Sequence, residues 1–569
     1  MIFSSKYGWV LLLVFLTALN GIASLVHCRI DLTAEKRYTL SEATKKLLSG
    51  LDGDITIDFF LQGNLNAGVK KLSNNTIELL QEFRDYSHGR VRFRTFDPLS
   101  ELADTAQSGF LDSLRRMGIE PNTQVVQTKK GDEQSQRIII PGAIVKYEDR
   151  IFPVDLLKGV QRGQEGQSPE QLYTNAETLL EYKFANAIEK ITRKTKPAVG
   201  YVMGNGEPLD FSVYNLIQGL RTEYRFGVVR LDSLPFIPSD YNALIIVKPT
   251  EKFTDAEKLK LDQYLMHGGN LVWMVDALHA ELDDSLMINN ETVAYDRGLN
   301  LEDLFFRYGV RINPDLVLDM QSASINFVTG MQGDKPQMSM LTWPYYPLLN
   351  GSLTHPISKN LDPVYAKFAN SIDTVKSPGI EKTILLQSSK NGRIVGTPAL
   401  ITLESLKTAN DASLFTRPDI PVAVLLEGHF TSLYTGRLSS AMADTLTNVY
   451  HRPFLATDSV RSRVLVCADA DIVMNDVARQ GPLPMGFNKD ISYRFANQDF
   501  IDNSLDYILN PSGILETRAK DFTLRLLDPK KVEQDHSFWQ FVNIVLPIGL
   551  VILLGFLFQW LRKRKYSGE

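Results

Sequence analysis

Cysteine is nearly absent from this sequence, with only Cys28 and Cys467 among 569 residues. Two such distant cysteines do not indicate a disulfide framework, and the lack of any Cys-x-x-Cys pair excludes dithiol redox chemistry of that type. The eight histidines are scattered, and none is spaced from another as metal ligands are. The sequence therefore predicts no metal site and no cofactor.

An excess of positive charge is also missing. Lys and Arg number 61 against 66 Asp and Glu, which gives a formal net charge of −5. Nucleic-acid binding proteins normally present a basic face, so the charge argues against this class. Hydrophobic residues make up 44% and charged residues 22%, as in folded domains. The length predicts two to four domains.

Motifs for catalysis are lacking as well. There is no Gly-x-x-x-x-Gly-Lys-Ser/Thr, which excludes ATP hydrolysis by a P-loop, and no Gly-x-Ser-x-Gly elbow. Cys467 lies inside an apolar stretch, where a thiol is expected to be inert. We predict that the chain is not an enzyme, and we favour a binding or scaffolding protein.

A long apolar run near the C-terminus, residues 538–561, contains no charged residue. It is long enough to cross a bilayer as a helix, and Trp539 and Trp560 lie near its ends, where indole rings favour the headgroup region. Four basic residues follow it directly. By the positive-inside rule, the tail 562–569 is predicted to be cytoplasmic.

A second apolar run, residues 8–26, lies between Lys6 and Arg29. It is either a retained transmembrane helix or a signal peptide cleaved after the small residues near Ala23, and we favour the retained helix. Both alternatives export the segment 29–537. We therefore predict a protein of the inner (cytoplasmic) membrane whose large part lies on the periplasmic side.

The segment 30–196 is predicted to be an N-terminal α/β domain. Alternating strands at 55–60 and 91–96 flank an amphipathic helix at 75–86, and this βαβ order predicts a parallel strand pair. Thioredoxin-like folds have the same order of elements. A helix at 174–192 and basic residues after it mark the domain boundary.

The segments 197–283 and 379–512 are predicted to form one doubly wound α/β domain, because near-continuous apolar strands alternate with helices. A capping box, Thr254 with Glu257, starts one of these helices, and Gly268 ends it. Residues 284–378 are interpreted as an insertion, and 513–537 as a linker to the membrane. The strands of this domain are expected at 198–203, 227–231, 243–247, 271–275, 422–426 and 464–468.

Candidate ligand-binding residues follow the ends of these strands, where α/β folds hold ligands. The turn Gly204-Asn205-Gly206-Glu207 could direct N–H groups at an anion, but a tight βα turn is the favoured interpretation. Asp276, Asp469 and Asp471 could bind a cation or transfer protons. Capping of the next helix is the favoured alternative for these carboxylates.

Several segments resemble a known family: 32–41, the turn 204–207, 253–270, 301–319, and the C-terminal stretches 538–543 and 562–566. They are similar to the GldG family of gliding-motility-associated ABC transporter proteins of Bacteroidota. The resemblance implies an auxiliary or substrate-binding-like subunit. Its implied partners are an ABC permease and a cytoplasmic ATPase, in a complex linked to gliding motility.

The middle of the chain also resembles the GIFT module of an intraflagellar transport protein, whose fold is akin to class I glutamine amidotransferases. Those enzymes need a nucleophilic cysteine at a strand-to-helix elbow. The corresponding turn here is Gly204-Asn205-Gly206, so that activity is expected to be absent.

Two hypotheses follow. In the first, the exported part is a fixed subunit of an ABC complex. Polar positions in the apolar runs (Asn20, Ser24, Asn543 and Gln559) then either hydrogen-bond the permease or lie hydrated at the membrane interface. In the second, it is a periplasmic solute- or glycan-binding receptor with its ligand at the strand ends.

Overall fold

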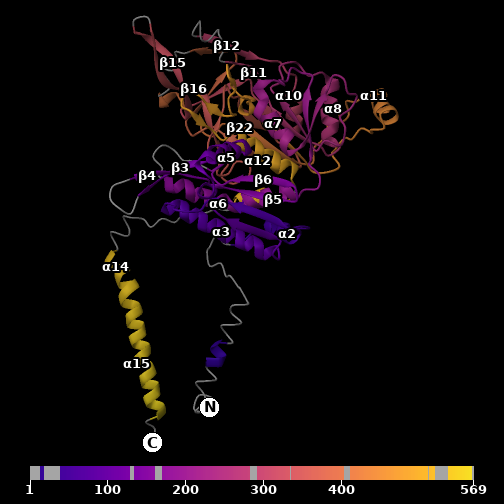
Figure 1. The fold of residues 1–569 in the computed structure, drawn as a ribbon. Coiled ribbons are helices and arrows are strands. Elements are labelled where there is room, and N and C mark those ends of the chain that lie inside the picture. Colours follow the sequence, from indigo (N-terminus) through magenta and orange to yellow (C-terminus); the bar gives the residue numbers. More distant parts are fainter. Residues whose placement is uncertain are drawn as a thin grey trace. The chain divides into compact units, whose positions relative to one another are not determined.

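The computed structural model describes residues 13–17, 39–127, 134–160, 169–281, 291–332, 335–402, 411–510, 512–519 and 536–566. Figure 1 shows its helices and strands. The chain divides into two compact units, 1–520 and 521–569, which are described separately. Of the N-terminal apolar run 8–26, only residues 13–17 are described, and they are helical and exposed. The rest of that predicted span lies outside the described residues.

A four-stranded sheet in the order β2-β1-β5-β6 forms the N-terminal lobe. β1 and β2 are parallel, which confirms the predicted βαβ unit, while β5 and β6 are antiparallel to their neighbours. The strands are β1 Ile55–Phe59, β2 Val91–Thr95, β5 Gly142–Tyr147 and β6 Arg150–Asp155. A separate hairpin pairs β3 Asn122–Gln127 with β4 Gln134–Ile139.

Helices of this lobe pack on its sheet with the apolar faces that the sequence indicates. The helices are α2 Glu42–Ser49, α3 Ala67–Tyr86, α4 Pro98–Glu101, α5 Asp104–Met117 and α6 Pro169–Thr192. The prediction that α3 starts at residue 75 was wrong by two turns. The side chain of Asn66 caps it by accepting a hydrogen bond from the Val69 amide, and Val69 and Leu72 are buried.

The main sheet has the strand order β15-β16-β19-β22-β23-β10-β9-β7-β8. From β23 to β8 the neighbours are parallel, and from β23 to β15 they are antiparallel. The parallel strands are β7 Ala198–Met203, β8 Arg225–Arg230, β9 Ala243–Val247, β10 Asn270–Met274 and β23 Ser462–Cys467. The antiparallel strands are β22 Pro421–Gly428, β19 Ile380–Gln387, β16 Lys335–Gly351 and β15 Ser322–Gln332.

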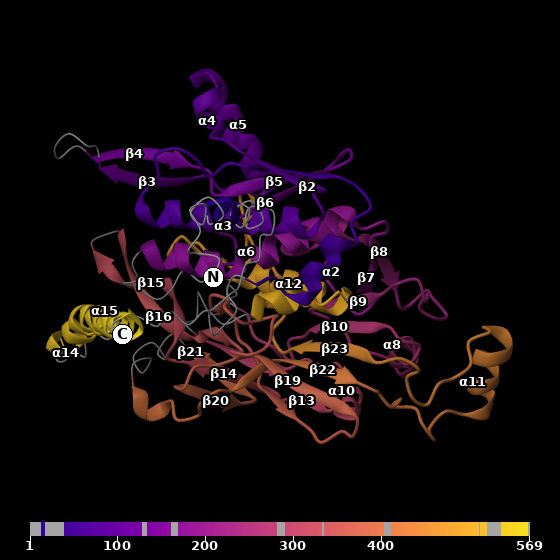
Figure 2. The same cartoon turned by 90° about the horizontal axis from the view of Figure 1, so that it is seen from below.

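Both faces of the parallel strands β7, β9, β10 and β23 are buried, as their apolar sequences predict, whereas the edge strand β8 is largely exposed. Side chains of β9 alternate between two cores: Ile245 packs with α7 (Tyr214–Glu223) and α12 (Asn497–Leu509). Leu244 and Ile246 pack in the core of α8 (Asp255–Met266) and α10 (Glu302–Tyr308). Figure 2 shows these strands side by side between the labelled helices.

The predicted capping of α8 is confirmed. The hydroxyl of Thr254 accepts a hydrogen bond from the Glu257 amide, and the Glu257 carboxylate accepts one from the Thr254 amide. Gly268 adopts a left-handed conformation with φ +90°, as expected of a residue that ends a helix. By contrast, no helix connects β8 to β9, so the doubly wound pattern is incomplete there.

The segment interpreted as an insertion has its own core, built around the buried Trp343. Its long hairpin β15–β16 joins the main sheet through β16 and β19. Shorter elements of residues 278–449 are β11 Leu278–His279, β12 Glu291–Asp296, β13 Val310–Ile312, β14 Asp315–Asp319, β17 Val364–Tyr365, β18 Ile372–Thr374, β20 Gly392–Gly396, β21 Ala399–Thr402, α11 Ser440–Asp444 and η5 Thr445–Val449.

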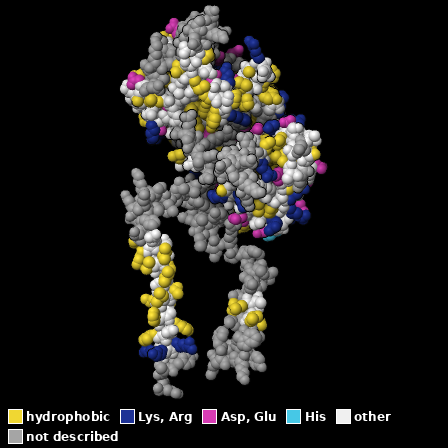
Figure 3. Space-filling model, turned by 60° about the vertical axis from the view of Figure 1, so that its left-hand side comes forward, with side chains coloured by type: hydrophobic (Ala, Val, Ile, Leu, Met, Phe, Trp, Pro, Cys, Tyr) yellow, Lys and Arg dark blue, Asp and Glu magenta, His cyan; other side chains and the backbone are white. Residues whose placement is uncertain are grey.

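The second unit is described from residue 536 as one helical stretch: α14 His536–Gln540, the π-helical turn η8 Phe541–Val545, and α15 Leu546–Tyr566. Residues 538–564 form the one helix among the described residues that is long and apolar enough to cross a membrane. Figure 3 shows its hydrophobic side chains and the Lys and Arg side chains at its end.

Candidate functional site

The carboxyl ends of the parallel strands hold most of the predicted site residues. β7 lies between β8 and β9, so the chain order reverses beside β7. The turn 204–207 follows β7, Asp276 follows β10, and Asp469 and Asp471 follow β23. In open α/β sheets, ligands bind outside the carboxyl ends of strands where the order reverses.

The three predicted aspartates do converge, and they converge on a lysine. The Lys248 ammonium lies 2.9 Å from Asp471 Oδ1 and 3.4 Å from Asp276 Oδ2. The half-exposed Glu281 is 3.7 Å away. Lys248, Asp276, Asp469 and Asp471 are called the Lys248 cluster below.

Burial and mutual charge set the pKa values in the Lys248 cluster. Burial, with Asp471 and Asp276 nearby, raises the pKa of Asp469 well above its usual value. Burial raises the pKa of Asp276 as well. Burial alone would raise the pKa of Asp471 too, but the ammonium of Lys248 outweighs it and lowers that pKa.

The carboxylates of this cluster also accept hydrogen bonds from the backbone. Asp469 accepts from the amides of Lys367 (2.7 Å) and Asp471 (2.8 Å), and Asp276 accepts from that of Ala470 (2.6 Å). These bonds fix the turn after β23, which begins the short 3₁₀ helix Asp471–Val473. The N-cap residue of this helix, Ala470, makes no side-chain capping bond, so both the capping role and the ligand-binding role of these aspartates stay predictions.

Sequence reasoning did not single out Lys248. The signal was available, because this lysine directly follows the fully apolar strand β9 at the edge that carries the aspartates. Its backbone has φ +46°, an uncommon conformation for a residue with a side chain. Its amide donates to Met274 O, which holds it at the end of β9.

The turn Gly204–Glu207 contacts a different segment. The amides of Thr250 and Glu251 both donate to Asn205 O at 2.9 Å, and the Asn205 side chain donates to Glu257 at 3.2 Å. Gly206 has φ +84°, and a Cβ there would lie 2.0 Å from Thr250 Oγ1. The geometry therefore supports a tight βα turn in which glycine is required.

Two oxygens of this turn are buried without a hydrogen-bond partner among the described residues: Asn205 Oδ1 and Glu207 Oε1. Burial raises the pKa of Glu207, whose other oxygen accepts from the Asn205 amide at 2.8 Å. None of the hydrogen bonds in the described part of the turn reaches the Lys248 cluster. The predicted site residues thus form two separate groups.

A cavity of about 510 Å³ lies elsewhere, between the N-terminal lobe and the main sheet. We call it the interlobe cavity. β6 and α6 line it from one side, and the end of α7 with α12 from the other. Charged residues of both signs line it: Arg150, Asp155, Lys158, Lys183, Lys190, Arg193, Lys196, Glu223, Asp499, Asp502, Asp506 and Arg518.

Lys190 connects the two sides of the interlobe cavity by ion pairs of 2.5 Å with Glu223 and 3.0 Å with Asp506. Lys183 instead donates to the carbonyls of Asp155 (2.9 Å) and Leu156 (2.6 Å). Burial lowers the pKa of Lys183 to about 7, and burial raises the pKa of Asp502 to about 6. Both groups therefore titrate near neutral pH. Sequence reasoning missed this cavity entirely.

Chemistry by a nucleophile or a metal finds little support. Cys467 is fully buried, and burial raises the pKa of its thiol well above the usual value. Within the described ranges, no group of three or more His, Cys, Asp or Glu residues could hold a metal ion. The arrangement can bind charged or polar groups, and it can couple the two lobes electrostatically.

These features define a mixed α/β protein with one candidate membrane span. A family model described as "ABC-type uncharacterized transport system" matches residues 196–504, which is more than half of the chain. The chain therefore belongs to this ABC transport auxiliary family, which is not a known enzyme family. Residues 34–146 match a second family model, a domain of unknown function.

A search of curated proteins found an uncharacterized protein of Borreliella burgdorferi, 22% identical over 400 residues, which covers 67% of this chain and 69% of that protein. Among solved structures, the N-terminal domain named mmIFT52 has a TM-score of 0.29 at 14% identity, and it covers 55% of this chain and 97% of its own. A mannosidase of an Opitutaceae bacterium has a TM-score of 0.19 at 11% identity, and the match covers 81% of this chain and 51% of the mannosidase chain. Neither score supports a shared fold, and the GIFT fold stays a prediction.

Proposed function

We propose that this protein is a non-enzymatic, extracytoplasmic auxiliary subunit of an ABC transporter complex, anchored beside the permease. Membership of the ABC transport auxiliary family carries the proposal. The apolar helix at residues 538–564 supports the anchoring, and the basic residues after it support a cytoplasmic tail. In this arrangement the protein receives or transmits conformational change across the membrane.

By the same family membership and by resemblance to the GldG family, the proposed partners are an ABC permease and a cytoplasmic ATPase. By its resemblance to the GldG family, we further propose that the complex serves gliding motility. The domain division also belongs to the proposal: an α/β domain at 30–196, a second at 197–283 with 379–512, and an insertion at 284–378.

Purification of the full chain from its native membranes in a mild detergent, through a C-terminal tag, tests this proposal. Recovery of a permease and an ATPase in a fixed ratio is expected. Recovery of the protein alone, with the permease demonstrably present in the same membranes, would overturn it.

The anchoring helix offers a matched set of variants for the same experiment. Asn543 and Gln559 are polar positions within the apolar span, where side chains hydrogen-bond neighbouring helices. Asn543→Leu and Gln559→Leu are expected to reduce co-purification of the permease, whereas Leu553→Ile on the same helix is not. Equal recovery of the permease with all three variants would show that residues other than Asn543 and Gln559 make the contact with the permease.

The interlobe cavity favours a second candidate function, a periplasmic solute- or glycan-binding receptor. Binding sites commonly lie between domains, and a cavity of about 510 Å³ is of the size that small ligands occupy. The ligand-binding role predicted for Gly204–Glu207, Asp276, Asp469 and Asp471 stays a prediction. Their internal hydrogen bonds make the interlobe cavity the better-placed site.

Thermal unfolding of the full chain with a panel of amino acids and sugars tests this candidate. A true ligand raises the melting temperature by mass action. The shift is expected to vanish in Lys183→Met, which alters the interlobe cavity, and to persist in Lys194→Met, whose side chain is 85% exposed and lies outside it. A panel without any stabilising solute would argue against the receptor.

A further inference from the structure

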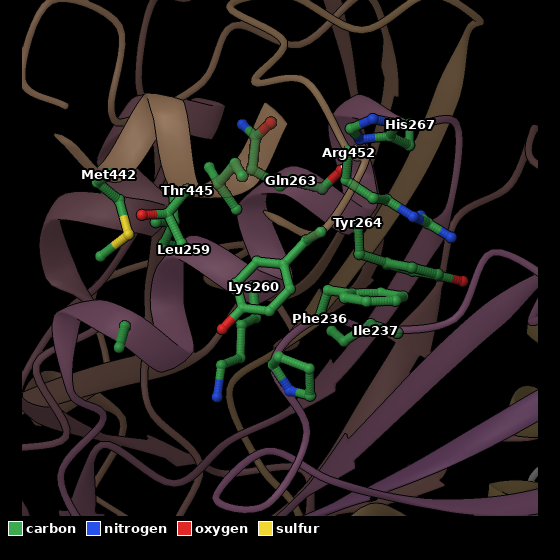
Figure 4. Close-up of a pocket in the computed structure, with 14 residues that line it drawn as sticks. Phe236, Ile237, Leu259, Lys260, Gln263, Tyr264, His267, Met442, Thr445 and Arg452 are labelled. Atoms are coloured by element: carbon green, nitrogen blue, oxygen red, sulfur yellow. Dashed lines mark hydrogen bonds between the residues drawn. The ribbon is translucent and has the colours of Figure 1, made fainter. Parts of the chain in front are cut away.

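An apolar pocket of about 390 Å³ lies between α8 and the segment 440–452, away from the residues discussed above. Figure 4 shows Met442 and Thr445 on one side of the view and Arg452 and His267 on the other. Pro235, Phe236 and Ile237 contribute from the loop between β8 and β9. The volume is within the range of sites that hold small organic ligands.

One wall of this pocket is a helix whose apolar face is only partly covered. α11 and η5 span residues 440–449, and none of their side chains is buried. Met442, Leu446 and Tyr450 are spaced four residues apart, so they share one face, and all three line the pocket. A ligand in the pocket would cover this face and remove its apolar surface from water.

The wall is nevertheless capped at its start and attached to α8 just beyond its end. Ser439 caps α11 by accepting a hydrogen bond from the Met442 amide at 3.3 Å. Beyond the helix, Leu455 exchanges two hydrogen bonds with the Gln263 side chain of α8, at 2.8 and 3.0 Å. η5 is a π-helical turn, a rare conformation that is frequent at functional sites.

The two charged side chains that line this apolar pocket, Lys260 and Arg452, are both cationic, and none of its lining residues is Asp or Glu. The Arg452 guanidinium lies 4.9 Å from the ring centroid of Phe236, and it forms no ion pair within the described ranges. Lys260 donates one hydrogen bond, to Leu231 O at 2.6 Å. Arg452 offers a planar set of donors that suits a carboxylate better than a lysine ammonium does.

We propose that this pocket binds a single-chain amphiphile with an anionic headgroup, such as a long-chain carboxylate. The alkyl chain lies against Leu446, Phe236 and Leu259, and Arg452 binds the headgroup. A guanidinium matches a carboxylate in a paired hydrogen-bonding geometry, which a neutral alcohol cannot reproduce. The inference does not depend on the proposed transporter role.

Photolabelling tests the inference on the full chain in nanodiscs of neutral phosphatidylcholine. The probe is palmitic acid with a diazirine and an alkyne tag, and mass spectrometry locates the labelled peptides. Labels are expected in 235–237, 256–267 or 442–450, in addition to the apolar helix 538–564. Labels confined to 538–564 would overturn the proposal.

Two variants and a control sharpen the experiment. Leu446→Asp places a charge in the pocket wall and is expected to reduce labelling of the pocket about tenfold. Val449→Asp is the matched control, because Val449 is on the same helix, is 65% exposed and does not line the pocket. An equal loss in both variants would refute the assigned site.

The anionic headgroup is tested separately with the corresponding tagged alcohol. The wild-type pocket is expected to take up the acid in preference to the alcohol, and Arg452→Gln is expected to remove that preference, a change of about fivefold. Equal labelling by acid and alcohol in the wild-type protein would overturn the headgroup assignment.

Discussion

Replacing Lys248 by methionine is expected to destabilise the protein strongly. The ammonium contacts Asp471 at 2.9 Å and Asp276 at 3.4 Å, and the three side chains are only 11%, 17% and 12% exposed. Removing one partner of a buried ion pair leaves a carboxylate without its counter-charge, which costs about 3–5 kcal/mol. Because Asp276 also keeps a backbone donor, we expect a loss of about 3 kcal/mol.

Thermal unfolding of the full chain measures this loss. At about 2–4 °C per kcal/mol, the melting temperature of Lys248→Met is expected to fall by about 6–12 °C at pH 7.5. Lys252→Met, an exposed lysine of the same segment, is the control and is expected to change little. A Lys248→Met variant that unfolds together with this control would refute the reasoning.

The pH dependence gives an independent check. Lys248 lowers the pKa of Asp471 in the folded protein. The stability that this ion pair adds is therefore fully present above the pKa that Asp471 has in the unfolded chain. It is lost as the pH falls through the lower pKa that Asp471 has in the folded protein. In Lys248→Met the carboxylates protonate more readily. The difference in stability between Lys248→Met and the wild type is therefore expected to become smaller as the pH is lowered from 7.5 to 4.5. At pH 7.5, the double variant Lys248→Met/Asp471→Asn should recover part of the stability that Lys248→Met loses.

Three further outcomes follow from the described geometry. Lys183 has a pKa of about 7 in the folded protein, so above pH 7 its side chain binds fewer protons there than in the unfolded chain. The free energy of unfolding is therefore expected to rise by about 1–2 kcal/mol between pH 7 and 8.5. Denaturant titration should find this rise in the wild type and not in Lys183→Met. Gly206→Ala places a Cβ against Thr250 in a backbone with φ +84°, which should lower the free energy of unfolding by about 2 kcal/mol. The control is Gly219→Ala within helix α7, where the nearest atom to an added Cβ is 3.9 Å away, so this variant should be neutral or stabilising. Equal melting temperatures of the two variants would contradict this. The peptide that contains Cys467 should resist alkylation until the protein unfolds, and rapid modification of the native chain would show that its strand opens.

Strongly periodic stretches made much of the fold predictable. The all-apolar run of β9 indicated a strand buried on both faces, and Thr254 with Glu257 marked the start of α8. The start of α3 was missed although Asn66 is a favourable cap and Val69 and Leu72 are spaced as residues on one helix face.

The candidate sites were predictable only in part. The position of Asp276, Asp469 and Asp471 after parallel strands was enough to predict that they meet at one edge of the sheet. The interlobe cavity could not be predicted from the sequence, because Lys190 and Asp506 are 316 residues apart and only tertiary packing brings them to 3.0 Å. The pocket beside α8 could not be predicted either, because it depends on the tertiary packing of the segment 440–452 against α8.

Helix α6 has a consequence for motion. Its apolar residues, such as Phe184 and Ile188, belong to one continuous core with Ile57 of the N-terminal sheet and Ile245 of the main sheet. Close-packed interiors deform little and pass strain from one side to the other. A displacement of the N-terminal lobe is therefore expected to move the main sheet with it, without a hinge between them.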